Sequence, residues 1–357
     1  MRRIAAGIGT AVLVILLLAC LQQLLKPKYT GSVLEGCFTE EYYREPYPHE
    51  LLILGNCDSY ENISPVTLWN EYGITSYIRG NSNQLIPQSY YLLKDALKDE
   101  TPKAVLLNVQ AMTVEGQTTE EYNRMVFDGM RWSGDKLAAI RATAMEDEHL
   151  LEYVFPLLRY HSRWQELSGD DLRYAFSEVP SRSFNGYYLR ADVRPYTEFP
   201  AERRRPDYTF PEINTEYLDR IRELCEENGI RLILMKAPAL YPEWPEPYED
   251  QIASYAKAHG LTYYNTLALS DEIGLDMSED TYDEGLHLNV YGAEKVARWL
   301  GAKLSEEIDF TDFHENAEIN KWYTELTARY EAEKARQAEE FAQTGSVTLS
   351  LQKSTGL

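Results

Sequence analysis

Two distant segments of this sequence carry residue types that could act together in nucleophilic catalysis. Cys57 lies in the stretch LLILGNCDSY, where an apolar run meets a glycine and then a series of polar residues. Asp283 and His287 lie in TYDEGLHLNVYGAEK, just before a helical pattern. A nucleophile on a strand-to-helix turn, a histidine base and a carboxylate that orients the base together form a catalytic triad. Cysteine suits the nucleophile's part because a neighbouring imidazole lowers the pKa of its thiol.

The same residues also have simpler interpretations. A DxxxH pattern alone has low specificity, and His287 could cap a helix or pack in the core. Ser59 is another candidate nucleophile, but its spacing from Gly55 is unfavourable. A base must lie within hydrogen-bond reach of its partner. A distance beyond about 6 Å from the Cys57 sulfur to the imidazole would therefore prevent catalysis without rearrangement.

The cysteines do not form a metal-binding pattern. No CxxC occurs, and none of Cys20, Cys37, Cys57 and Cys225 has a histidine at the spacing of zinc ligands. We therefore expect neither a metal nor a cofactor. In an oxidising compartment Cys37 and Cys57 could form a disulfide, which would exclude a catalytic Cys57.

Alternating strands and helices must position these residues. Short apolar runs that end in glycine or polar residues predict five strands, in ELLILG, GITSYIRG, KAVLLNVQ, RLILMKAP and LTYYNTL. Helical periodicity fills the intervals, as in PQSYYLLKDALKDE and NTEYLDRIRELCEENG. This alternation predicts an α/β fold with a parallel sheet and helices on both of its faces.

A long insertion divides the two α/β blocks at about residues 112–211. Its first half is helical in pattern, and its second half is irregular and rich in Tyr, Arg and Pro. Open α/β sheets bind ligands at the carboxyl ends of their strands, so this insertion is placed to form a lid or a substrate wall. We expect one main domain over residues 29–310, then a charged helix and a flexible tail over 311–357.

Lys236 and three tryptophans could belong to a binding site, but a purely structural role is the simpler interpretation. Lys236 ends a strand, where a surface or paired lysine is the usual case. Trp132, Trp164 and Trp244 could line a sugar site, although packing in the core or in a lid accounts for them equally well.

The first 28 residues predict a membrane anchor. Residues 4–25 are apolar apart from two glutamines, and their number suits a helix that crosses a bilayer. The arginines before the run favour a cytoplasmic N-terminus and an extracytoplasmic body, although the lysines after it weaken the asymmetry. A signal segment is the alternative, and LLAC at Cys20 is similar to a lipoprotein processing site. In either case we expect the body to lie outside the membrane, at the cell surface.

The net charge excludes one class of partner. The formal charge is −22 and the isoelectric point is about 4.7. Proteins that bind nucleic acid need dense Lys and Arg surfaces to neutralise phosphates. We therefore expect no nucleic-acid partner.

The combination of motifs resembles the SGNH/GDSL hydrolase superfamily. The similarity lies in the strand order, the GNC turn after the first strand and the late DEGLHLNVYGAEK. More narrowly, GNCDSYENISPVTLWNEYGITSY, NQLIPQSYYLLKDAL and FPLLRYHSRWQEL resemble membrane-anchored SGNH-like proteins of Gram-positive bacteria. The resemblance covers nearly all of the body and implies a flavodoxin-like sheet. Related members include the D-alanyl-transfer protein of teichoic-acid modification and the acetylation proteins of alginate synthesis.

The resemblance also implies roles for individual residues. Cys57 falls at the position of the family's nucleophilic serine, with Asn56 and Asp58 beside it. His287 matches the base. The superfamily's usual carboxylate, three residues before the histidine, would be Glu284, whereas the narrower group implies Asp283, which we favour.

The expected oxyanion donors depart from the family pattern. The resemblance implies the backbone amide of Cys57 together with Gly80 or Asn83, and Gln110 in place of the usual asparagine. The blocks GxND and GxxG are not intact. The family therefore implies two alternatives. One is an esterase or O-acyltransferase acting on acyl groups of a cell-surface polymer. The other is an inactive accessory or carbohydrate-binding protein beside a membrane-bound O-acyltransferase.

Overall fold

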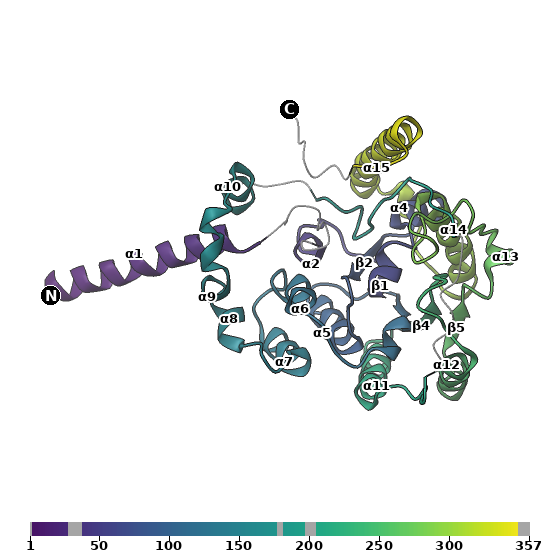
Figure 1. Cartoon of the computed structure of the whole chain (residues 1–357), viewed down its shortest axis with the longest axis horizontal. Helices are drawn as coiled ribbons and strands as arrows, with labels where there is room; N and C mark the ends of the chain where they lie inside the picture. Colours follow the sequence, from purple (N-terminus) through teal and green to yellow (C-terminus); the bar gives the residue numbers. More distant parts are fainter. Residues whose placement is uncertain (1, 28–37, 177–180, 197–204, 349–357) are drawn as a thin grey trace.

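A five-stranded sheet forms the centre of the computed structural model, which describes residues 2–27, 38–176, 181–196 and 205–348 (Figure 1). All neighbouring strands pair in parallel, in the order β2-β1-β3-β4-β5. Their bounds are β1 (Leu51–Gly55), β2 (Ser76–Gly80), β3 (Ala104–Asn108), β4 (Arg231–Lys236) and β5 (Thr262–Asn265). The predicted parallel α/β fold is confirmed, and this strand order is that of flavodoxin-like folds.

The two faces of the sheet bury alternate side chains of each strand. In β1, Leu51 and Ile53 join one core cluster, whereas Leu52 and Leu54 join the other. The strands have continuous apolar sequences because helices cover both faces of the sheet. One face is covered by α4 (Pro65–Tyr72), α14 (Val290–Glu307) and α15 (Ala317–Thr344), and the other by α5 (Ile86–Ala96), α11 (Glu212–Glu227) and α12 (Glu246–His259).

Local sequence signals set the ends of the helices that flank the site. The Ser64 hydroxyl accepts the backbone N–H of Thr67 at the start of α4, and Gly73 ends that helix with φ 67°. Asn289 caps α14 by accepting the backbone N–H groups of Tyr291 and Gly292. The loop that carries His287 is therefore fixed to the N-cap of a helix two residues later.

The C-terminal helix α15 contributes one face to the core. Ile319, Tyr323, Leu326 and Tyr330 are buried with the residues of the sheet, and Tyr323 stacks on Trp69 with ring centroids 4.2 Å apart. The ten charged residues of α15 are all exposed or half-buried. Residues 349–357, in the expected flexible tail, lie outside the described part.

Short helices complete the chain outside the sheet layers. Three of them precede or follow the early strands: α2 (Phe38–Tyr42), α3 (Cys57–Tyr60) and the 3-10 helix η2 (Val109–Thr113). The insertion contains α6 (Glu120–Phe127), α7 (Gly134–Thr143), α8 (Leu150–Val154), α9 (Leu157–Tyr160), η3 (His161–Gln165) and α10 (Gly169–Phe176). Later in the chain come α13 (Ser270–Ile273) and η4 (Phe313–Glu315).

The insertion separates into two parts with different positions. Its helices α6 and α7 extend the helical layer over α5, where Val126, Phe127 and Ile140 join the core. Residues 181–196, which we name the strap, have the irregular structure that the sequence predicts. The strap runs along the edge strand β2, where Asn185 accepts the N–H of Ile78 and donates to Ser76. Among the described residues of the insertion, those of the strap reach the loop that carries His287.

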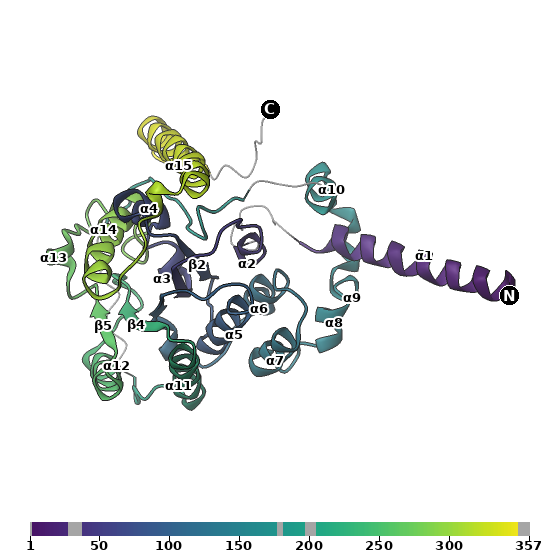
Figure 2. The same cartoon turned by 180° about the vertical axis from the view of Figure 1, so that it is seen from behind.

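The N-terminal helix α1 (Arg2–Leu25) projects away from the body (Figures 1 and 2). Among the described residues, the segment Arg3–Leu25 is long and apolar enough to cross a membrane, with a mean hydropathy of 2.7. Within the described part of the chain, the helix touches the body at its last turns, where Leu25 is buried. The prediction of one N-terminal membrane-spanning helix is supported by length and composition.

We predict that Gly186→Ala loosens the strap. Gly186 has φ 80°, and an added Cβ would lie 2.1 Å from the backbone oxygen of Ile78. We expect a loss of more than about 2 kcal/mol, because strain and a backbone clash add together. Gly229→Ala is the control, since Gly229 has φ 68° but open space around it, and should cost about 1 kcal/mol. Equal losses in thermal unfolding of the two variants would contradict the proposed clash.

Candidate functional site

A sharp turn at the carboxyl end of β1 presents Cys57. Gly55 has φ 148°, and a Cβ there would lie 2.3 Å from the Ser59 hydroxyl and 2.8 Å from Asn108, so only glycine fits. Asn56 then has extended backbone, and α3 starts at Cys57. The thiol is half-buried and free. The strand-to-helix elbow expected from the sequence is therefore present.

His287 is held by Asp283 through two hydrogen bonds. The imidazole Nδ1 lies 2.6 Å from Asp283 Oδ2, and the backbone N–H of His287 donates to Asp283 Oδ1 at 2.7 Å. Thr281 closes the loop by donating to the His287 carbonyl and accepting the N–H of Gly285. A carboxylate on Nδ1 fixes the tautomer that leaves Nε2 free to act as a base.

Glu284, the alternative carboxylate, points elsewhere. It has φ 67° and forms an exposed ion pair with Arg194 at 2.8 Å. The carboxylate that contacts His287 is therefore that of Asp283, four residues before it.

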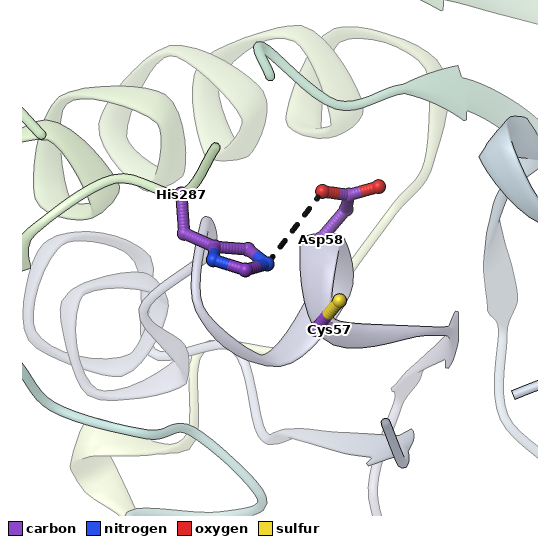
Figure 3. A group of neighbouring side chains, drawn as sticks. All are labelled: Cys57, Asp58 and His287. Carbon is purple, nitrogen blue, oxygen red and sulfur yellow. Dashed lines mark ion pairs between the residues drawn. The ribbon is translucent and has the colours of Figure 1, made fainter. Parts of the chain in front are cut away.

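The free side of His287 faces Cys57 and Asp58 (Figure 3). Nε2 lies 4.0 Å from Asp58 Oδ1, and the Cys57 sulfur, an Asp58 oxygen and a His287 nitrogen all lie within 4.8 Å of one another. Both Nε2 and Asp58 Oδ1 are buried, and neither has a hydrogen-bond partner among the described residues. Cysteine and histidine are thus closer than the 6 Å limit, and the base presents an unused nitrogen to the thiol.

Two further residues hold the histidine loop. Glu61 lies 3.7 Å from His287 Nδ1 and accepts a hydrogen bond from the Tyr282 hydroxyl, and the Tyr282 ring stacks on the imidazole at 6.2 Å. Asn62 accepts the N–H of Leu288 at 2.7 Å. Sequence reasoning missed these residues, although Glu61 lies four positions after Cys57, one helical turn away, which is the spacing that could have indicated it.

The expected oxyanion residues lie near the carboxyl edge of the sheet. Gly80 pairs with Gly55 across β1 and β2, and Asn83 has φ 53°. The Asn83 carbonyl accepts a hydrogen bond from Gln117. Gln110 is buried after β3, and both its side-chain nitrogen and its oxygen lack a partner among the described residues. Of these candidates, Gln110 has the unused side-chain donor that an oxyanion would need.

Asn108 is a residue of this edge that the sequence analysis did not single out. Its side chain donates to Asn56 Oδ1 at 3.2 Å and accepts the backbone N–H of Gln110 at 3.2 Å. It therefore joins the Cys57 elbow to the segment that carries Gln110.

Burial and charge shift the pKa values of the central pair. Burial raises the pKa of the Cys57 thiol, and the nearby imidazole lowers it in part. Burial alone would lower the pKa of His287, but the charge of Glu61, followed by Cys57 and Asp283, raises it well above its ordinary value. Ionisation of the thiol therefore depends on the imidazole that faces it.

Lys236 is a fully buried lysine, so of the two expected alternatives, a surface or a paired residue, the surface one is wrong. Its ammonium donates to the carbonyls of Ala237 and Ala239 at 2.7 and 3.3 Å. Burial lowers the pKa of Lys236 to about 8, against the opposing charge of Asp58. Burial also raises the pKa of Asp58, and the charges of Lys236 and His287 partly offset that rise. Lys236 is thus a counter-charge to the acidic groups of the site.

The sequence left two alternatives for the Cys57 elbow: Ser59 as the nucleophile, and a disulfide between Cys37 and Cys57. Ser59 is buried, and its hydroxyl donates to the Leu54 carbonyl at 3.3 Å, so it supports the turn instead of facing His287. The pairing of Cys57 with Cys37 falls on a residue outside the described part, and Cys57 itself carries a free thiol.

Cys57, Asp58 and His287 also have the chemistry of zinc ligands. Tetrahedral zinc with bonds of about 2.0 to 2.3 Å holds its ligand atoms roughly 3.3 to 3.7 Å apart. The 4.0 Å separation of Nε2 from Asp58 Oδ1 is wider than that. The three groups would have to approach one another to close on a metal.

Neither the protein-family models nor the curated proteins contain a match to this chain. The site is therefore interpreted from its own geometry.

We predict that His287→Gln slows alkylation of Cys57. His287 lowers the pKa of the thiol, so its removal raises that pKa and reduces the thiolate present at a given pH. The measurement is iodoacetamide labelling of the detergent-solubilised chain over a pH series, resolved by peptide mass. Cys225, whose pKa burial raises to about 12, is the internal control. A Cys57 labelling profile identical in wild type and variant would disprove the coupling.

We predict that Lys236 makes stability increase with pH. A lysine whose pKa is lower in the folded state opposes folding below about pH 8, and this penalty fades as pH rises towards 10.5. The difference corresponds to about 3 kcal/mol. Lys236→Met should remove this pH-dependent gain, whereas Lys303→Met, an exposed lysine paired with Glu272, should retain it. The measurement is the free energy of unfolding as a function of pH. The same change in that free energy between pH 8 and 10.5 for wild type and Lys236→Met would contradict the prediction.

Proposed function

We propose that this protein is a membrane-anchored, SGNH-like esterase or O-acyltransferase that acts on acyl groups of a cell-surface polymer. The observation that carries the proposal is the alignment of Asp283, His287 and Cys57: a carboxylate on Nδ1 at 2.6 Å, and an unpartnered Nε2 on the side of the thiol. This is the order of orienting group, base and nucleophile in a triad.

The reaction proceeds through a thioester. His287 Nε2 takes the proton of the Cys57 thiol, and the sulfur attacks the ester carbonyl of the acyl donor. Collapse of the tetrahedral intermediate breaks the carbon–oxygen bond, and the imidazolium returns the proton to the leaving alcohol. Water or an acceptor hydroxyl, deprotonated by His287, then attacks the thioester, the carbon–sulfur bond breaks, and His287 returns the proton to the Cys57 sulfur. Water gives an esterase, and a sugar hydroxyl gives an acyltransferase.

Other residues support this chemistry from fixed positions. Asp283 holds the tautomer and Glu61 favours the imidazolium formed in the first step. The Gln110 amide and the backbone N–H of Cys57 are the donors proposed for the oxyanion. In this proposal α1 anchors the chain, the body lies outside the cytoplasm, and a membrane-bound O-acyltransferase is its expected partner.

The decisive experiment is trapping the acyl group. The full chain in detergent is treated with p-nitrophenyl acetate, and Cys57 is examined by peptide mass for a hydroxylamine-sensitive acetyl group. Cys57→Ala should lose the acetyl group, and His287→Gln should form it at least about 100-fold more slowly. Ser59→Ala is the control for the elbow and should behave as wild type.

The same experiment separates the competing functions. A chain that is folded but never acylated at Cys57 would reject catalysis and favour the inactive accessory or carbohydrate-binding role. Protection of Cys57 from acylation by added zinc, reversed by a chelator, would instead assign Cys57, Asp58 and His287 to a metal site.

A further inference from the structure

Exposed apolar side chains gather on one part of the insertion. Outside α1, the described residues include seven large hydrophobic side chains that are exposed, and five of them lie on or beside α8, α9, η3 and α10. These five are Leu151, Phe155, Leu158, Trp164 and Leu172, with 63%, 50%, 53%, 65% and 53% of their surface exposed. Apolar surface concentrated in this way marks an interaction site.

These helices lie across the end of α1 that adjoins the body. Figures 1 and 2 both show α8, α9 and α10 in a row, running across the axis of α1. The Arg163 guanidinium donates to the Leu25 carbonyl at 2.7 Å, and Lys26 donates to the Asp128 carbonyl at 2.7 Å. The row is therefore attached to the last turn of the helix that is apolar enough to span a bilayer.

The two sides of this row differ in character. The side towards the body carries polar side chains that have hydrogen-bond partners: Arg159 pairs with Glu120 at 2.9 Å, and Tyr160 donates to Asp128 at 2.8 Å. Leu151 lies in α8, Phe155 directly follows that helix and Leu158 lies in α9, and all three side chains are exposed. The row is thus amphipathic, with its apolar side facing away from the protein.

The charges of the row indicate which kind of membrane contact it could make. Residues 149–176 contain three arginines against four Asp and Glu residues. Such a segment has no excess positive charge with which to attract anionic lipids. Contact must therefore come from apolar and aromatic side chains, and tryptophan is favoured at the membrane interface because its ring is apolar and its N–H is polar.

We propose that Leu151, Phe155, Leu158, Trp164 and Leu172, which we name the membrane face, insert into the interfacial region of the bilayer that α1 crosses. The attachment to Leu25 supports this occupant over a protein partner. If α1 spans the bilayer, its C-terminal end lies at the interface, and a row of helices fixed across that end lies at the same level. The body then rests on the membrane in one orientation. This inference requires the anchor but not the catalytic function.

The test uses tryptophan fluorescence of the full chain. The sequence of α1 contains no tryptophan, so quenching by lipid reports on the body alone. The protein is reconstituted in nanodiscs of phosphatidylcholine, either unmodified or brominated on the acyl chains close to the headgroup. We expect brominated lipid to quench the wild type, and Trp164→Phe to reduce the quenched fraction at least twofold. Trp299→Phe, in α14 on the far side of the body, should match the wild type.

A second variant tests the proposal independently and retains Trp164 as the fluorescent probe. Leu151→Asp combined with Leu158→Asp changes two exposed side chains and should leave the fold intact, yet it should lower the quenched fraction at least twofold. Quenching should persist at high salt, since no excess positive charge is involved. Equal quenching of wild type and Trp164→Phe, or no quenching of the wild type, would overturn the proposal, and the second result would favour a protein partner on this face.

Discussion

The concentration of charge beneath the carboxyl edge of the sheet is the constraint on which the rest of this structure depends. Asp58 and His287 are almost fully buried, with Glu61 and Asp283 beside them, and Lys236 is fully buried nearby. Removing charges from water costs several kcal/mol each unless partners compensate. Compensation here is mutual, because the carboxylates stabilise the imidazolium and Lys236 stabilises Asp58. Loss of one member would therefore leave the others unpaired in a buried site.

The parallel sheet makes this arrangement possible from distant segments. Asn62 and Leu288, which tie the two halves of the site together, are 226 positions apart in the chain. In a parallel sheet, successive strands bring their carboxyl ends to one edge, and the crevice lies where the strand order reverses. β1 lies at that reversal, between β2 and β3. Because Gly55 has no Cβ, Ser59 and Asn108 can pack closely against it, and α3 can begin two residues after β1 ends.

The sequence predicted those parts of the structure that local patterns control. All five strands and the Cys57 elbow follow from apolar runs and turn residues, and the resemblance to the narrower SGNH-like group implied Asp283 as the partner of His287. Features that depend on tertiary packing were not predictable in the same way. Lys236 differs from a surface lysine only through what covers β4, and one face of α15 enters the core despite its charged sequence. Glu61 gains its role only because the His287 loop packs over α3.

One part of the insertion contacts the end of α1, and another part contacts the loop that carries His287. Its helices bind the end of α1 through Arg163, and its strap reaches the site, where Arg190 covers the Tyr282 ring at 4.5 Å and Arg194 donates its backbone N–H to Thr281. The strap also pairs with β2, so it is fixed to the sheet along its course. In the proposed function, in which α1 anchors the chain, these contacts place one part of the insertion at the end of α1 and another part at the histidine loop. An enzyme that acts on a polymer held at the cell surface would benefit from such contacts, because they would help to present its site to that polymer.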